Sequence, residues 1–386
     1  KQGEYESALL RLGESLELAE KHGFTSLKAK IYSSLGDGYR LESKYKQALT
    51  LYENALEIDK TLNNRFEEGL HHGNLGTVYF DLGQLEKAIV CFQKSLEIAR
   101  EIGNKRSEGI NLAELGNIHS YLDRYEQSIL LYQFSLAIAR EIGDKQREGL
   151  LLGNLGTVYD NLGEYDAAII SSQKALEIVR EIGDKRGEGL HLGNLGTVYF
   201  KVLRYEDSIA SFKKSITISQ EVGAKRNEGV YLGNLAEVLV KLERLEEAKD
   251  ALLRAIEICD IAMPPASGTF RGTLALLYAT NGAFEEAFEE LEKGEVFVAV
   301  MPSEHGKFLC KKAKVYYLTN QVEEANKALK EAEEITEKIN TGENSELRRN
   351  ITETKAFISE KVTIPKSGLS KEAAAQGLSF DEKEDL

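Results

Sequence analysis

The chain has 386 residues, of which 29% are charged, and its formal net charge is −14. An acidic chain with an isoelectric point near 5.2 repels the phosphates of nucleic acids and the headgroups of anionic lipids, so we expect neither as a partner. Its apolar runs are too short for a membrane span, so we expect no membrane insertion. Three scattered cysteines, Cys91, Cys259 and Cys310, do not indicate a disulfide framework, and they predict a reducing, cytoplasmic compartment.

One segment recurs along the chain with a period of 40 residues. The stretch EGLLLGNLGTVYDNLGEYDAAI (148–169) returns as EGLHLGNLGTVYFKVLRYEDSI (188–209). A period of this size is typical of solenoids, in which each repeat buries its apolar face on its neighbours. A small residue follows each central residue by twelve positions, from Ala48 to Ala248. The central residues of the six regular repeats are Gly36, Gly76, Gly116, Gly156, Gly196 and Ala236.

Each repeat predicts two amphipathic helices. Leu192, Leu195 and Tyr199 fall on one stripe of the first helix together with Gly196, whose missing side chain is expected to let the second helix approach near Ser208. A glycine ends each second helix and is placed to adopt the left-handed conformation. These glycines are Gly103, Gly143, Gly183 and Gly223. Asp144 and Asp184 are suited to cap the next helix, and Glu148 and Glu188 favour its positive end.

The repeats predict four regions. Residues 1–258 form a regular array of a leading half repeat and six full repeats, and 259–343 form two irregular repeats. A helix within 344–361 is expected to cap the stack, and 362–386 to form a disordered acidic tail. Because the chain begins at Lys1 inside a repeat, we expect it to be part of a longer protein.

Prolines interrupt the pattern after the regular array. Pro264 and Pro265 predict a longer connection there, because a helix interior does not accept proline. The segment MPSEHG (301–306) predicts a second connection of this kind.

This pattern resembles the tetratricopeptide repeat. The family motif W-x-x-L-G-x-x-Y, followed by positions for alanine, phenylalanine and alanine, is matched by Leu195, Gly196, Tyr199, Ala168 and Phe92. Leucine takes the place of the tryptophan, at Leu112, Leu152, Leu192 and Leu232. The 40-residue form is similar to that of Pins-like spindle-orientation adaptors and of bacterial sensor and regulatory arrays. The resemblance implies an all-α fold, a right-handed α-solenoid of antiparallel helix pairs.

The resemblance also implies a protein–protein interaction scaffold, which binds a partner peptide or helix in the concave groove of the superhelix. The alternative is a regulatory or sensor array of a larger signalling protein, controlling a fused kinase, nucleotide-binding switch or caspase-like protease. Reading the full coding frame on both sides of the chain distinguishes the two. The sequence indicates neither the identity of the partner nor the oligomeric state.

In the family geometry the first helices line the concave side, and we number the repeat so that the central glycine is position eight. Position six carries the asparagine row, Asn74, Asn154, Asn194 and Asn234. An asparagine amide both donates and accepts, so it can pair with the backbone of an extended peptide. The alternative is that these asparagines, together with the glycines at position five, join adjacent first helices. Both interpretations stay open.

Other positions of the first helix complete the expected groove. Position nine supplies Thr77, Thr157, Thr197 and Asn117, and positions twelve and thirteen supply Phe80, Phe200 and Tyr121 as apolar anchors. Glycine at position five is expected to permit close approach of the ligand, at Gly73, Gly153, Gly193 and Gly233. An aliphatic row at position two, if exposed, favours an apolar strand or amphipathic helix as the ligand. This row is Leu70, Ile110, Leu150, Leu190 and Val230.

The sequence contains no catalytic constellation. His71 and His191 occupy equivalent places three repeats apart, so they cannot share a metal ion. The GNLG segments lie within helical repeats rather than after a strand, which does not fit a phosphate-binding loop. Cys91 is interpreted as a small core residue next to Phe92. We therefore expect no enzymatic activity, no metal site and no cofactor.

Overall fold

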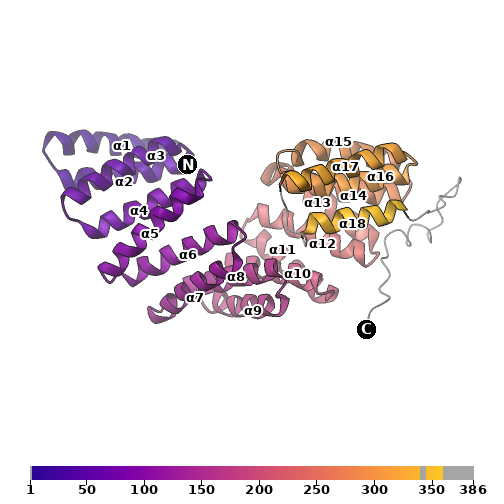
Figure 1. The fold of residues 1–386 in the computed structure, drawn as a ribbon, viewed down its shortest axis with the longest axis horizontal. Helices are drawn as coiled ribbons and strands as arrows, with labels where there is room; N and C mark the ends of the chain where they lie inside the picture. Colours follow the sequence, from indigo (N-terminus) through magenta and orange to yellow (C-terminus); the bar gives the residue numbers. More distant parts are fainter. Residues whose placement is uncertain (1, 340–344, 360–386) are drawn as a thin grey trace. The chain divides into compact units, whose positions relative to one another are not determined.

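The computed structural model describes residues 2–339 and 345–359, which form eighteen helices joined by short turns (Figure 1). No β-strand occurs within these two ranges. Each first helix packs against the second helix that follows it, which gives a series of antiparallel helix pairs. The all-α solenoid class predicted from the period is confirmed. The segment 362–386, predicted to be disordered, lies outside the described residues.

First and second helices alternate along the chain. The first helices are α2 (Thr25–Leu41), α4 (Arg65–Asp81), α6 (Lys105–Tyr121), α8 (Lys145–Leu162), α10 (Lys185–Lys201), α12 (Lys225–Lys241), α14 (Pro264–Thr280) and α16 (Pro302–Leu318). The second helices are α3 (Tyr45–Thr61), α5 (Leu85–Glu101), α7 (Tyr125–Glu141), α9 (Tyr165–Glu181), α11 (Tyr205–Glu221), α13 (Leu245–Ala262), α15 (Phe284–Val298) and α17 (Val322–Lys338). The leading half repeat supplies α1 (Gln2–Lys21), and α18 (Glu346–Ser359) follows the last pair.

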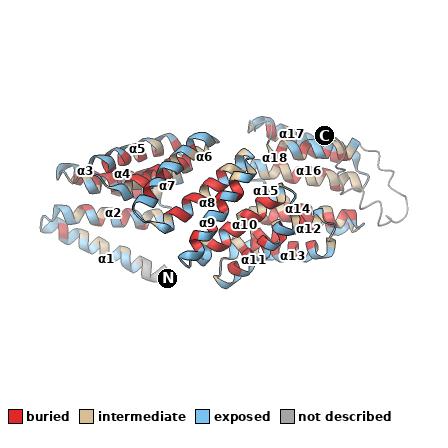
Figure 2. Cartoon of the chain, turned by 90° about the horizontal axis from the view of Figure 1, so that it is seen from below, coloured by how far each residue is buried: buried red, intermediate tan, exposed pale blue. Residues whose placement is uncertain are grey.

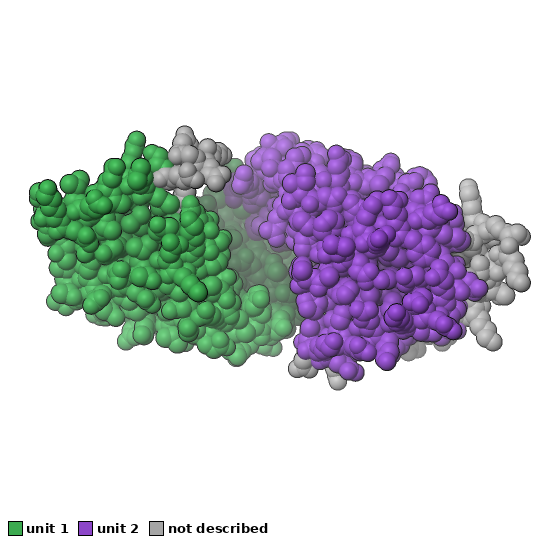
Figure 3. Space-filling view, turned by 90° about the horizontal axis from the view of Figure 1, so that it is seen from above, with its two compact units in different colours: residues 1–183 green, residues 184–386 purple. Residues whose placement is uncertain are grey.

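The chain divides into two compact units, residues 1–183 and residues 184–386 (Figure 3). Unit 1 contains α1 to α9, and unit 2 contains α10 to α18. The division falls at the turn between α9 and α10, inside the regular array. Within each unit, a second helix also packs against the first helix of the next repeat, so each unit has a continuous core.

The turns between repeats use the predicted capping residues. The four glycines after the second helices adopt the left-handed conformation, with φ of +72° at Gly183. The Asp184 side chain then accepts a hydrogen bond from the backbone N–H of Gly187 at 2.9 Å, which caps α10. Asp144 caps α8 in the same way, through the N–H of Arg147. These capping predictions are confirmed.

The predicted longer connections at the prolines are wrong. Only Met263 separates α13 from α14, because Pro264 and Pro265 occupy the first turn of α14. The first N–H groups of a helix have no intrahelical acceptor, so proline costs no hydrogen bond there. Pro302 begins α16 in the same way, and the segment 302–306 is helical.

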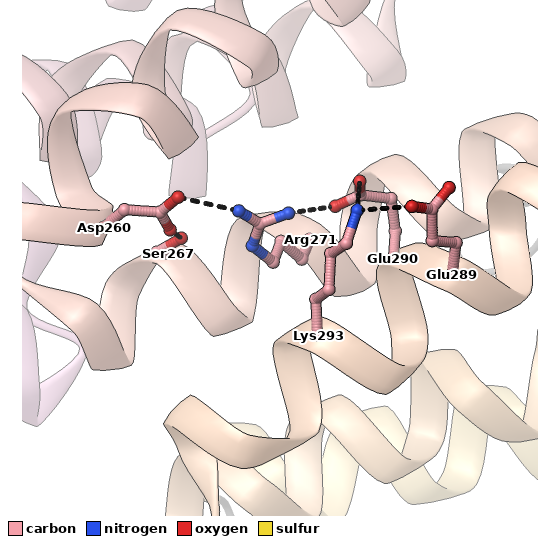
Figure 4. A network of polar contacts seen from close by, with 6 residues as sticks. All are labelled: Asp260, Ser267, Arg271, Glu289, Glu290 and Lys293. Carbon is pink, nitrogen blue, oxygen red and sulfur yellow. Dashed lines mark hydrogen bonds and ion pairs between the residues drawn. The ribbon is translucent and has the colours of Figure 1, made fainter.

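An internal polar network holds the first irregular repeat together (Figure 4). Arg271 of α14 occupies the repeat position at which four regular repeats carry a buried leucine, and it is itself buried. Its guanidinium donates to Asp260 of α13 at 2.8 Å and to Glu290 of α15 at 2.5 Å. Ser267 also donates to Asp260, and Lys293 pairs with Glu289 at 2.6 Å. The buried Arg271 guanidinium thus joins α13, α14 and α15 through two ion pairs, while the pair of Lys293 and Glu289 lies at the surface.

Buried residues lie along the sides of the helices that face neighbouring helices (Figure 2). The closest approaches within a pair occur at position eight. A Cβ placed on Gly196 would lie 2.8 Å from the ring of Phe212 on α11. Ser208, also on α11, donates to the carbonyl of Gly196 at 2.7 Å. The expectation that Gly196 permits close approach of the second helix near Ser208 is confirmed.

Two glycines at position five join adjacent first helices, as the alternative interpretation of the asparagine and glycine positions predicts. A Cβ on Gly193 would lie 2.1 Å from the ring of Tyr231, which belongs to the first helix of the next repeat. The ring of Phe270 fills the equivalent space at Gly233. The room at these two glycines is therefore occupied by the neighbouring repeat, and the prediction that it admits a ligand is wrong there.

We predict opposite effects of alanine at two equivalent glycines. Gly193→Ala places a methyl group into the Tyr231 ring, and overpacking of this kind costs about 1–3 kcal/mol. At Gly73 the nearest contact of a new Cβ is 3.5 Å, so Gly73→Ala should instead gain up to about 1 kcal/mol of helix propensity. Thermal unfolding followed by circular dichroism should show a lower melting temperature for Gly193→Ala only. Equal losses in both variants would contradict this packing.

Candidate functional site

The asparagine row lies on the first helices, and all four side chains are half-exposed. Within the described part of the chain, the amides of Asn74, Asn194 and Asn234 make no hydrogen bond. Asn154 differs, because its Nδ2 lies 3.4 Å from Oδ1 of Asn117 on α6. Three of the four amides are therefore available to an external partner, and one also contacts the adjacent first helix.

Position nine is used inside the repeats. The hydroxyls of Thr77, Thr157 and Thr197 donate to the carbonyl four residues earlier, at 3.2, 3.2 and 3.3 Å. Asn117 accepts from the Tyr132 hydroxyl at 2.6 Å and donates to Glu114 at 3.0 Å. Their hydrogen-bonding capacity is thus largely directed to their own unit.

The residue at position nine depends on its neighbour on the second helix. Where that helix presents a tyrosine, position nine is a polar acceptor: Tyr132 donates to Asn117, and Tyr52 donates to Asp37 at 2.5 Å. Where the helix presents Phe212, which has no hydroxyl, position nine is threonine. The residue at position nine and the aromatic residue of the second helix are always fifteen residues apart in the sequence. This fixed offset is the sequence signal for their contact.

The aliphatic row at position two is exposed on three first helices. Leu70 and Leu190 are each 38% exposed and Leu150 is 50% exposed, whereas Ile110 and Val230 are half-buried. Leucine side chains with this exposure lie beside half-exposed asparagines four residues further along the same helix face. The first helices thus present both apolar surface and amide groups.

The aromatic residues at positions twelve and thirteen differ in how far their side chains are exposed to solvent. Phe80 and Tyr121 lie together with ring centroids 6.1 Å apart, and Tyr121 is 70% exposed. Phe200 packs against the core of unit 2 and lies 6.0 Å from Tyr205. Tyr121 is therefore the exposed aromatic residue of the three, while Phe80 and Phe200 are half-buried and each packs against the core of its unit.

His71, Cys259 and Cys310 are buried, and His71 is paired with a carboxylate. His71 Nε2 lies 2.9 Å from Oδ2 of Asp59, which also accepts from Asn64. Burial raises the pKa of the Cys259 and Cys310 thiols to about 11, which disfavours the reactive thiolate. No group of histidine, cysteine and carboxylate side chains suited to a metal ion occurs among the described residues.

A buried glutamate begins each regular first helix from α4 to α12, at Glu68, Glu108, Glu148, Glu188 and Glu228. Arg140, at the end of α7, donates to Glu148 at 2.7 Å, and Lys145 lies 3.1 Å from its second oxygen. Burial raises the pKa of the Glu148 carboxyl, whereas the two cations lower it. Together the cations have the larger effect, so the pKa lies below the ordinary value of 4.5. Glu148 therefore joins consecutive repeats, a role that goes beyond the predicted interaction with the helix terminus.

We predict that Glu148→Gln destabilises unit 1 in a pH-dependent way. Because the folded pKa is lowered, the carboxylate contributes stability above the ordinary pKa, and this contribution is lost as the pH falls through the folded pKa. The charged hydrogen bonds should be worth about 1–3 kcal/mol at neutral pH. The difference between the melting temperatures of wild type and variant should shrink as the pH falls from about pH 7 to about pH 4.

The matched control is Glu177→Gln, which removes an exposed carboxylate from α9 of the same unit. It should leave the melting temperature almost unchanged across this range. A difference between Glu148→Gln and wild type that stays constant with pH would contradict the ion-pair account.

Comparison with known families and structures gives one consistent result. A family model described as tetratricopeptide repeat matches residues 66–141, 109–181 and 187–260, and a second model of the same description matches residues 31–66. A search of curated proteins finds no significant match. None of the described helices has the length and apolar character needed to cross a membrane.

Several solved structures share the fold at low sequence identity. The apo form of the quorum sensor NprR from B. thuringiensis is 17% identical, with a TM-score of 0.57, covering 86% of this chain and 97% of that one. A Rap protein complexed with competence and sporulation factor is 13% identical, with a TM-score of 0.55, covering 91% of this chain and 100% of the other. A signal transduction ATPase with a tetratricopeptide repeat sensor, from Pyrococcus horikoshii, is 20% identical, with a TM-score of 0.61, covering 76% of this chain and 46% of that one.

Proposed function

Because the chain belongs to the tetratricopeptide repeat family, whose members are protein-interaction and regulatory scaffolds, we propose that its first helices bind an extended segment of a partner protein. The observation that carries the proposal is the set of unpaired, half-exposed amides of Asn74, Asn194 and Asn234. An extended segment has backbone N–H and C=O groups that lose water on binding, and asparagine satisfies both.

Exposed leucines beside the amides favour a partner with alternating apolar side chains. Leu190 lies on the same face of α10 as Asn194, and it is exposed although it is aliphatic. Exposed apolar surface next to polar groups is typical of an interaction site. The backbone of the partner would bind to the amides, while its apolar side chains would cover the leucines.

A regulatory array is the second candidate. The tetratricopeptide repeats of the Pyrococcus horikoshii protein act, by its description, as the sensor of an ATPase, and the Rap protein is described in complex with a factor. These similarities support a sensor in which partner binding is relayed to an effector domain, and a cytoplasmic location is part of either proposal. Sequencing the flanking coding region tests this candidate, since a scaffold alone requires no effector.

We predict that Asn194→Ala combined with Asn234→Ala weakens peptide binding. Ligands are first selected on wild-type protein from a display library of random peptides, and their dissociation constants are then measured by fluorescence anisotropy. Two lost hydrogen bonds at about 0.5–1.5 kcal/mol each should weaken binding by about tenfold. The amides have no partner within the described chain, so the melting temperature of the double variant should stay unchanged.

The control for this experiment replaces exposed amides on second helices, with Gln93→Ala and Gln133→Ala. It should leave affinity as in the wild type. Unchanged affinity in a normally folded asparagine double variant would remove the asparagine row from the binding site. A parallel loss of affinity and melting temperature would assign these residues to the scaffold instead.

A further inference from the structure

An exposed apolar patch lies on three second helices of unit 1, on the side that faces away from the first helices. Tyr132 of α7 faces Gly116 of α6, and Leu130 stands two residues before it, on the opposite side of α7. The side chains of the patch are between 50% and 53% exposed. We define the outer patch as Leu130 and Phe134 of α7 with their neighbours Val90 of α5 and Ile170 of α9.

The residues of the outer patch differ from those at the same repeat positions in the adjacent pairs. Leu130, Val90 and Ile170 are equivalent by the 40-residue period, and the equivalent residue is Thr50 in α3 and the smaller Ala210 in α11. Phe134 stands where α5 and α9 carry an exposed lysine. Apolar side chains that gather on an exposed surface are typical of an interaction site.

The helix at the centre of the patch, α7, has no charge along its middle. No charged residue occurs between Glu126 and Arg140, a stretch in which α5 and α9 carry lysine and glutamate side chains. On its inner side α7 packs against α6 and α8. A surface helix normally has a polar outer face, whereas a helix that is apolar all round is typical of burial on both sides. The composition of α7 therefore indicates a further partner on its outer side.

The two helices beside α7 carry charges in a pattern that complements itself. On α5 an exposed acid, Glu86, stands four residues before Val90, and an exposed base, Lys94, stands four residues after it. The two charged residues make no ion pair or hydrogen bond within the described chain. They lie about 12 Å apart along the helix, too far to pair with each other. The same arrangement recurs on α9, with Asp166 and Lys174 around Ile170.

A two-fold axis makes this pattern match a second copy of itself. When the axis lies in the interface and crosses the helices at Val90, Leu130 and Ile170, each helix pairs with the same helix of the other copy in antiparallel orientation. Residues equally far from the axis then oppose each other. Glu86 of each copy faces Lys94 of the other. On α9, Asp166 of each copy faces Lys174 of the other in the same way.

We propose that unit 1 binds a second copy of this chain through the outer patch, with α7 antiparallel to the α7 of the other copy. The two Leu130 side chains meet at the axis, flanked by the Phe134 rings of both copies. Charge pairs on α5 and α9 surround this apolar centre, as the polar rim surrounds the core of other protein interfaces. The surface lies on second helices, so the inference goes beyond the proposed function of the first helices.

Analytical ultracentrifugation of the full chain tests the proposal, at about 0.1 M salt, where the Debye length is about 10 Å. The mass of one chain is 43.0 kDa. The weight-average mass should rise toward twice this value between about 1 μM and about 100 μM protein, because association depends on concentration.

Leu130→Thr with Phe134→Lys removes the apolar centre. These substitutions introduce the residue types that α3 and α5 carry at the same repeat positions, so unit 1 should fold normally, and circular dichroism checks this. The loss of apolar contact in both copies should raise the dissociation constant of the dimer by at least about tenfold.

The matched control is Leu253→Thr with Ile261→Lys on α13 of unit 2, whose side chains are 43% and 89% exposed. It makes the same two types of change on another second helix, and should alter the dissociation constant by less than about twofold.

Charge reversal distinguishes a second copy from a different partner. Glu86→Lys alone or Lys94→Glu alone places like charges opposite each other at two points of the dimer, and should weaken association several-fold. The variant with both changes has the reversed pattern in both copies, so association should return to within about twofold of the wild type. A partner with its own fixed charges does not give this recovery.

Three results would overturn the proposal. The first is a weight-average mass that stays at that of one chain up to about 0.5 mM protein. The second is association that Leu130→Thr with Phe134→Lys leaves unchanged in a normally folded chain. The third is a double charge reversal that associates no better than the single ones, which would exclude the antiparallel pairing.

Discussion

In the repeats of Gly36, Gly76, Gly116 and Gly196, the contact between this glycine of the first helix and an aromatic ring of the second helix determines the packing of the pair. A Cβ at Gly36, Gly116 or Gly196 would lie 2.8 Å from the facing tyrosine or phenylalanine ring, so the helices can pack at this distance only without it. The missing side chain costs about 1 kcal/mol of helix propensity, which burial of a ring offsets. The contact also fixes the rotation of the first helix, since one of its faces must point at the ring.

This fixed rotation decides which side chains of the first helix remain available. Position eight faces the second helix, and position five faces the next repeat where Tyr231 and Phe270 fill the space. Position nine is directed to its own unit by the hydroxyl of Tyr132 or by the helix carbonyls. Positions two and six are left, and they carry exposed leucines and unpaired asparagines. The proposed binding surface thus consists of the side chains of the first helix that neither pack against another helix nor form a hydrogen bond within the unit.

Local rules predicted much of the fold, because each helix pair repeats the same pattern. The left-handed Gly183 and the cap at Asp184 follow from neighbouring residues alone. The prediction at the prolines was wrong because proline is unfavourable inside a helix but favourable in its first turn. The sequence around Pro264 does not show that a helix begins there.

Contacts between repeats were harder to predict than contacts within them. The space beside Gly193 belongs to Tyr231, 38 residues later, and a glycine that serves a neighbour has the same sequence signature as one that serves a ligand. The hydrogen bond from Arg140 to Glu148 joins α7 to α8, so it depends on the packing of consecutive repeats, which the sequence does not give. Lys307, Lys311 and Lys314 can be placed on one helix face from the sequence, but the ion pair of Lys307 with Glu346 depends on the packing of α18 on α16.

The central claim is that a partner binds the surface of the first helices left open by packing. Photo-crosslinking tests it most directly: a library-selected peptide carrying a benzophenone is irradiated on wild-type protein, and the modified residues are identified by mass spectrometry. The account predicts crosslinks on first helices, at positions two, six and thirteen, around Leu190, Asn194 and Lys201 in unit 2. Crosslinks confined to second helices, such as the exposed residues Leu130 and Phe134 of α7, would contradict it.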